Sequence, residues 1–142
     1  MSQPQSRFLE KIGRVHDVVV MYLFGSRAAD GLRILSGEKV ADEGGSDLDV
    51  GVVLARPFDD PMLGFGGLHA DLSELFSPLR VDLVLLDEAG AFIREAAILG
   101  TEIYCGDEHR RDLWELDALR RAGDLLPIQR HVERLLYGRT SR

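Results

Sequence analysis

The sequence has one cysteine, Cys105, in 142 residues. A single cysteine cannot form an internal disulfide or supply the thiolate pairs of a zinc finger, so disulfide scaffolds and cysteine-based zinc sites are excluded. Histidine offers no substitute. The four histidines share no ligand spacing, and we assign them no role: His16, His69, His109 and His131.

Long apolar runs and an excess of positive charge are also missing. No stretch approaches the ~20 apolar residues of a membrane span. Residues 1–14 carry scattered charges and no apolar export segment, so we expect a cytoplasmic protein without a membrane partner. The net charge of −7 argues against direct nucleic-acid binding, because such binding depends on Lys and Arg that neutralise phosphates.

The composition, 45% hydrophobic and 29% charged, is typical of a globular domain. The length suits one catalytic unit, which we expect over residues 1–106, and a helical extension over 107–142 that packs on the core or on a partner. In that extension we expect Leu113 and Leu116 in the core. Trp114 and Tyr137 are equally compatible with a core and an interface.

Hydrophobic periodicity and turn residues predict an α+β fold, a small mixed β-sheet with helices packed on it and a C-terminal helical tail. The expected helices cover 5–16, 27–30 with Gly31 as its end, a segment through 68–76, 87–99 with Asp87 as cap, and a tail from 107 that bends or breaks near Pro127. The expected strands cover 18–24, 47–54, 81–86 and 102–105. Residues 32–45 form an insert, with room for a small hairpin, that we expect to be mobile and peripheral.

Three aspartates interrupt runs of Val and Leu that otherwise predict strands, although Asp is disfavoured in strands. Asp47 and Asp49 are two residues apart, so in an extended chain they project from the same face. Asp82 adds a third carboxylate if its strand lies beside the first. Three hard oxygen ligands suit Mg²⁺, which completes its shell with water and substrate phosphates.

A glycine-serine turn follows the first expected strand. Gly25 allows a backbone to approach phosphates closely, and Ser26 offers a hydroxyl and a helix start for them. Ser26 could also be a helix cap, a role that is compatible with phosphate binding. Arg27 would add positive charge at the same place. Ser46 either orients Asp47 by a hydrogen bond or only begins the strand.

Gly25-Ser26, Asp47-x-Asp49 and Asp82, in this order, resemble the minimal nucleotidyltransferases of the DNA polymerase β-like superfamily, over roughly residues 18–105. The resemblance implies transfer of AMP from ATP to a hydroxyl with two Mg²⁺ ions, with Asp82 also accepting the nucleophile's proton. The twenty positions from 27 to 46 form a longer spacer than most members show.

The resemblance also implies a partner. Small stand-alone members often act as antitoxins that adenylylate a tyrosine of a HEPN-type ribonuclease toxin, and oligomers are compatible with that role. A small-molecule transferase of the aminoglycoside-modifying type is an alternative, although the residues after 106 leave little room for its second domain. A third reading is a non-catalytic antitoxin that acts by binding alone.

Overall fold

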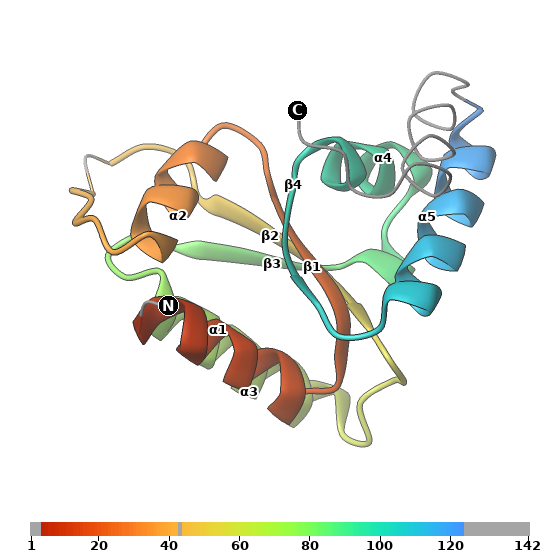
Figure 1. Ribbon diagram of the computed structural model, residues 1–142, viewed down its shortest axis with the longest axis horizontal. Coiled ribbons are helices and arrows are strands. Elements are labelled where there is room, and N and C mark those ends of the chain that lie inside the picture. The colour runs from red at the N-terminus through yellow and green to blue at the C-terminus, as the bar shows by residue number, and fades with distance from the viewer. Residues whose placement is uncertain (1–3, 43, 124–142) are drawn as a thin grey trace.

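The computed structural model describes residues 4–42 and 44–123 (Figure 1). In chain order the elements are α1 (Pro4–Val15), β1 (Val18–Phe24), α2 (Ala28–Leu35), β2 (Leu48–Leu54), α3 (Pro61–Leu75), β3 (Val81–Leu85), the 3-10 turn η1 (Leu86–Glu88), α4 (Ala91–Leu99), β4 (Thr101–Cys105) and α5 (Glu108–Ala122). The strands form one sheet in the order β3-β2-β1-β4. Strand β2 runs parallel to β3, whereas β1 is antiparallel to both β2 and β4. The predicted α+β class with a small mixed sheet is confirmed.

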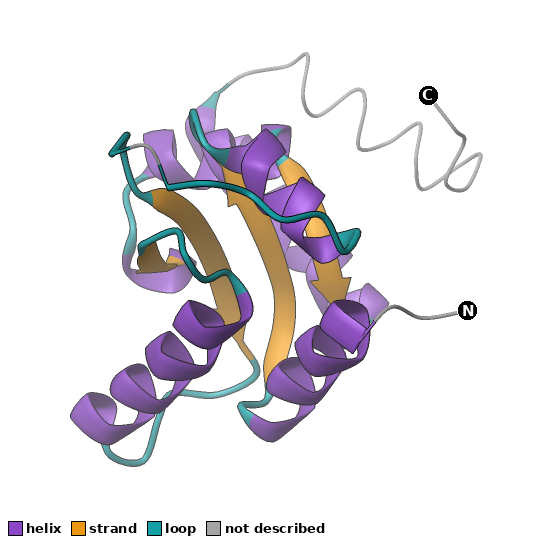
Figure 2. Ribbon diagram, turned by 90° about the vertical axis from the view of Figure 1, so that its left-hand side faces the viewer, coloured by secondary structure: helices purple, strands orange, loops and turns teal. Residues whose placement is uncertain are grey.

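The sheet lies between two groups of helices. Helices α1 and α3 cover one face, and α4 and α5 cover the other (Figures 1 and 2). Strand β1 is at the centre of this arrangement, and all of its residues are buried. A strand buried on both faces reads as a continuous apolar run, which is the pattern of residues 18–24.

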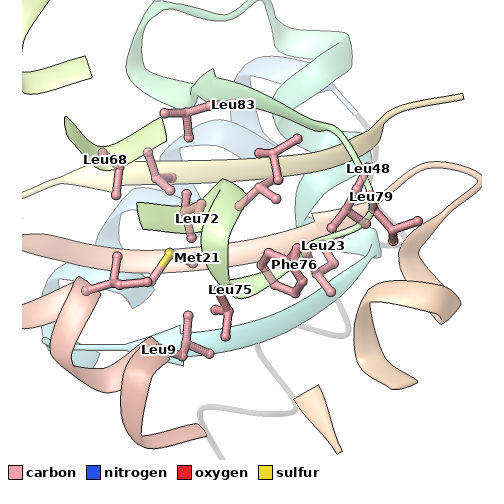
Figure 3. Close-up of a cluster of buried hydrophobic side chains, with 14 of the residues drawn as sticks. Leu9, Met21, Leu23, Leu48, Leu68, Leu72, Leu75, Phe76, Leu79 and Leu83 are labelled. Carbon is pink, nitrogen blue, oxygen red and sulfur yellow. The ribbon is translucent and has the colours of Figure 1, made fainter. Parts of the chain in front are cut away.

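The larger apolar cluster fills the face covered by α1 and α3 (Figure 3). Leu68 and Leu72 of α3 are fully buried there and pack with Met21 of β1 and Leu48 of β2. Because side chains alternate along a strand, burying Leu48 and Val50 on this face turns Asp49 to the opposite one. The core therefore fixes which face carries the carboxylates.

Helix α5 is attached to the other face by buried polar groups. Arg111 is 2% exposed, and its Nη1 donates to Glu102 of β4 at 2.9 Å. Burial alone would lower the pKa of Arg111, but the Glu102 carboxylate outweighs it and raises the pKa. The Tyr22 hydroxyl donates to the fully buried Glu115. Breaking such buried pairs is costly, so α5 is an integral layer of the described structure.

Several local predictions are wrong at the ends of elements. Helix α2 does not stop at Gly31 but continues to Leu35, and Ile34 is in the core, so the first part of the 32–45 insert is not peripheral. No hairpin forms in the described part of that insert. A 3-10 turn precedes α4, whose N-cap is Gly90 and not Asp87. Leu113 is 56% exposed, so the prediction that it lies in the core is wrong.

The structure decides between core and interface for one of the two aromatic residues of the C-terminal extension, Trp114. Trp114 is half-buried, packs at a ring-centroid distance of 6.2 Å from Tyr22, and donates from Nε1 to Asp87 Oδ1 at 3.1 Å. It therefore contributes to the second apolar cluster. Tyr137 lies outside the described residues, and so does the predicted bend near Pro127. None of the helices in the described ranges is long and apolar enough to cross a membrane.

Candidate active site

Two of the three predicted aspartates meet at the start of the parallel pair of strands. Asp49 of β2 and Asp82 of β3 are direct partners in the parallel register, flanked by the pairs Leu48–Val81 and Val50–Leu83. The flanking residues are buried, so alternation places both carboxylates on the opposite face. Neighbouring strands lie about 4.8 Å apart, which brings the two carboxylates within reach of one cation or one shared proton.

The electrostatics of Asp49 show this proximity. Its pKa is raised, first by partial burial, then by the negative charge of Asp82 and a hydrogen bond with that side chain, and then by the charge of Asp47. Burial and like charges both disfavour ionisation. Asp49 therefore takes up a proton more readily than an exposed aspartate where no cation balances its charge.

The third aspartate has a different contact. Asp47 lies one residue before β2, and its Oδ1 is 3.2 Å from Nε of Arg80 in a solvent-exposed ion pair. Within residues 4–42 and 44–123, no three His, Cys, Asp or Glu side chains are grouped so that they could hold a metal ion. The structure brings Asp49 and Asp82 together. Asp47 lies in the segment that leads into β2, two residues before Asp49, and its carboxylate is paired with Arg80.

Gly25 lies close to the Asp49 carboxylate of this pair. It follows β1, where Phe24 pairs with Asp49, and it has a φ of +79°. A Cβ at this position would lie 2.3 Å from Asp49 Oδ2. A residue with a side chain would meet both backbone strain and the carboxylate, so the turn requires glycine. The backbone of the turn thus passes directly beside Asp49.

Ser26, Arg27 and Ser46 form a second group next to this turn. Ser26 does not cap α2, because the N-cap is Arg27 and Ser26 Oγ instead lies 2.7 Å from Ser46 Oγ. Arg27 donates from Nη1 to the Ser46 carbonyl at 3.1 Å and from Nε to Asp30 at 2.8 Å. Ser46 therefore joins the two ends of the long spacer and begins no strand, since β2 starts at Leu48.

Sequence reasoning missed two residues of this region. Arg80 is the basic neighbour of Asp47, and Asp30 holds Arg27 in place. The Asp30 contact had a detectable signal, because the two residues are three positions apart on a helix. Arg80 had none, since its pairing depends on how β3 lies beside β2.

The residues at the carboxylate pair fit a Mg²⁺ site by the chemistry of their donors. Asp49 and Asp82 offer hard oxygen ligands, and the raised pKa of Asp49 indicates negative charge that a cation would balance. Asp47 can join them if its side chain leaves Arg80. The exposed ion pair contributes only about 0–1 kcal/mol, so it is a small obstacle.

The chain is similar to known proteins in sequence and in fold. The family described as "Polymerase beta, Nucleotidyltransferase" matches residues 8–109. No curated protein matches. A toxin–antitoxin MntA–HpeT mutant structure has a TM-score of 0.57 at 17% identity, covering 95% of this chain and 95% of that chain.

A second similar structure is that of a tri-AMPylated Shewanella oneidensis HEPN toxin in complex with MNT antitoxin. It has a TM-score of 0.56 at 19% identity and covers 96% of this chain and 95% of that chain. At such identities the similarity establishes the fold, whereas the family match covers most of the sequence, including the Gly25 turn and both paired aspartates. The chain therefore belongs to the polymerase beta family of nucleotidyltransferases.

Proposed function

We propose that this protein is a cytoplasmic antitoxin that transfers AMP from ATP to a tyrosine hydroxyl of a HEPN-type toxin, with Mg²⁺ as cofactor. The observation that carries the proposal is the in-register pair Asp49–Asp82 beside the Gly25 turn, in a chain of nucleotidyltransferase family. The similar structures include a tri-AMPylated toxin with its MNT antitoxin and a toxin–antitoxin with AMP-PNP, an ATP analogue.

The solved structures that the chain resembles favour this role over modification of a small molecule. The match to MntA and MNT structures extends over about 95% of both chains. Those structures are toxin–antitoxin complexes, in which the partner is a protein. We therefore propose a protein acceptor.

In the proposed reaction, the tyrosine oxygen forms a bond to the α-phosphorus of ATP as the bond from that phosphorus to pyrophosphate breaks. Asp82 accepts the tyrosine proton, and solvent then takes it. Gly25 lets the backbone approach the phosphates, while Ser26 supplies a hydroxyl and Arg27 a fixed positive charge near them. Asp47, Asp49 and Asp82 would hold Mg²⁺, which when bound neutralises charge on the entering and leaving oxygens.

The test is co-expression with the cognate HEPN-type protein, followed by intact mass of the toxin. Wild type should add one or more AMP units. Asp49→Asn and Asp82→Asn should each reduce labelling by about a hundredfold or more, because a metal contributes several kcal/mol to the transition state. Both variants should still melt cooperatively. Labelling at the wild-type rate in both variants would refute the proposal.

A non-catalytic antitoxin is the second candidate, and the Asp47–Arg80 ion pair is the observation that favours it. If the antitoxin acts by binding alone, the Asp49→Asn variant should protect cells from the toxin as well as the wild-type protein does. If protection requires labelling, Asp49→Asn should instead bind the toxin and leave its toxicity intact. Growth assays of cells that express the toxin with Asp49→Asn, with Asp82→Asn or with the wild-type protein distinguish the catalytic from the non-catalytic antitoxin.

A further inference from the structure

A cavity of about 580 Å³ lies between α2 and the loop that follows it, next to the Ser26–Ser46 contact. Small-molecule sites are typically about 300–1,000 Å³ in volume, so the cavity is large enough for part of a ligand. Three of its lining residues are cations and one is an anion: Arg27, Arg33, Lys39 and Asp30. The cavity is built by the long spacer between Gly25 and Asp49.

The Arg27 guanidinium is the most informative group in this lining. Its side chain is 13% exposed, although a buried charge is stable only when its hydrogen bonds are made. A guanidinium has five N–H donors. The bonds to Asp30 and to the Ser46 carbonyl engage Nε and Nη1. An anion with several oxygens in the cavity would accept hydrogen bonds from the guanidinium N–H groups that these two bonds do not use.

Positively charged side chains outnumber negatively charged ones around the cavity. Asp30 is shared, because Arg33 Nη1 also lies 3.6 Å from it. Arg33 has a further partner in Glu38 at 3.1 Å, and both of these side chains are half exposed. Lys39 makes no ion pair within residues 4–42 and 44–123. Asp30 and Glu38 thus balance the two guanidiniums, and the ammonium of Lys39 is the excess positive charge that is available to a ligand.

The loop is shaped to keep Arg27 in this position. A Cβ on Gly45 would lie 3.0 Å from Arg27 Nη1, so the loop backbone packs directly on the guanidinium. The neighbouring Ser46 also bonds to Ser26, which connects the cavity to the glycine-serine turn. The guanidinium therefore lines the cavity and bonds to Ser46, and the Ser46 hydroxyl in turn contacts the turn beside Asp49.

We propose that this cavity is a phosphate-binding pocket adjoining the transfer site, with Arg27, Arg33 and Lys39 as its cations. The inference rests on the proposed function for the source of the phosphate, which is either the end of the ATP triphosphate or the phosphodiester on an acceptor that already carries AMP. Both present tetrahedral oxyanions, the shape that guanidinium groups bind through paired hydrogen bonds.

The experiment measures binding without transfer, so it does not depend on catalysis. The probes are inorganic triphosphate and the AMP ester of N-acetyltyrosine amide, titrated in EDTA by calorimetry. The variants are Arg33→Gln and Lys39→Gln, singly and together. The matched controls are Arg56→Gln and Lys11→Gln, which remove the same charges outside the cavity lining.

Each cavity variant should weaken binding of at least one probe by roughly threefold, and the double variant by roughly tenfold, since exposed charges contribute modestly. Loss for triphosphate identifies the nucleotide as the source, and loss for the ester alone identifies the modified acceptor. Equal binding of both probes by wild type and double variant, equal losses in the controls, or no binding by wild type would each overturn the pocket. Labelling at the wild-type rate in both Asp49→Asn and Asp82→Asn would instead refute the proposed function and leave this binding result standing.

Discussion

At the scale of single residues, the raised pKa of Asp49 has a consequence for stability when no divalent cation is present. The folded protein binds a proton at Asp49 more tightly than the unfolded chain, whose value is near 3.8. The cost to stability is therefore complete above the raised pKa and disappears as the pH falls towards 3.8. Asp49→Asn removes this cost.

We expect Asp49→Asn in EDTA to unfold at a higher urea concentration than wild type at pH 7, by less than about 1 kcal/mol because solvent screens a partly exposed carboxylate. The gain should shrink at pH 4. Urea melts at both pH values measure it, with the exposed Asp59→Asn as control. A gain of the same size at both pH values would mean that charge is not its cause.

Gly25 and Gly44 allow backbone strain to be separated from contact. Both have a positive φ, +79° and +78°, but a Cβ on Gly44 would meet nothing within 4 Å. Alanine at either position should cost about 1–2 kcal/mol from the left-handed backbone. Only Gly25→Ala should also push the Asp49 carboxylate aside and reduce AMP transfer by about tenfold or more. Chemical melts with parallel transfer assays measure both effects, and equal transfer by the two variants would contradict the contact.

At the scale of elements, α2 shows how a glycine extends a helix that its sequence appears to end. Gly31 is buried, and a Cβ there would lie 2.8 Å from Leu23 Cδ1 and 3.0 Å from Leu48 Cδ1. The absent side chain lets α2 lie close against β1 and β2. That close packing, which residue preferences alone do not reveal, explains why the helix passes through a residue that usually stops one.

Gly31→Ala and Gly66→Ala should therefore change stability in opposite directions. Gly66 is exposed within α3, and a Cβ there would meet nothing within 4 Å. Alanine should stabilise α3 by up to about 1 kcal/mol. In α2 the same gain is outweighed by crowding of about 1–3 kcal/mol. Thermal melts measure both, and a stabilised Gly31→Ala would show that α2 can move off the sheet freely.

The elements also show how far the sequence could predict the site. Alternation of Asp49 with buried Leu48 and Val50 predicts its face. The sequence left it as a condition that the strand of Asp82 lies beside that of Asp49, and the structure supplies this pairing. The family resemblance is confirmed by the match over residues 8–109. The Asp47–Arg80 pair was not predictable, because it depends on the distance between two chain segments and not on a pattern within either.

At the scale of the whole molecule, α5 presents an exposed surface on the far side of its buried polar groups. Arg120 and Arg121 are exposed in its last turn, and Arg121 pairs with Asp117 at 2.9 Å. A helix whose inner face is fixed by Arg111 and whose last turn is basic suits an acidic partner surface. Recognition of the acceptor by this part of the chain remains our prediction.

Reversing both charges, Arg120→Glu with Arg121→Glu, should weaken binding of the HEPN-type protein, by about 1 kcal/mol or less for each charge. Nucleotide affinity and melting temperature should change little. Calorimetry with ATP and with the partner measures the two affinities on one preparation. Lys11→Glu with Arg56→Glu gives the same change in net charge elsewhere. If that control weakens partner binding equally, the effect comes from overall charge and not from α5.

The contact between Gly25 and the Asp49 carboxylate has an evolutionary consequence. While the carboxylate is present, two independent constraints keep glycine at position 25, the positive φ and the lack of space. In a lineage that lost catalysis and replaced Asp49 with a smaller residue, only the φ constraint would persist, and asparagine tolerates a positive φ better than most residues with a side chain. Descendants with a decayed site should therefore carry asparagine at position 25 together with a small residue at position 49, a paired replacement by which inactive relatives can be identified from sequence.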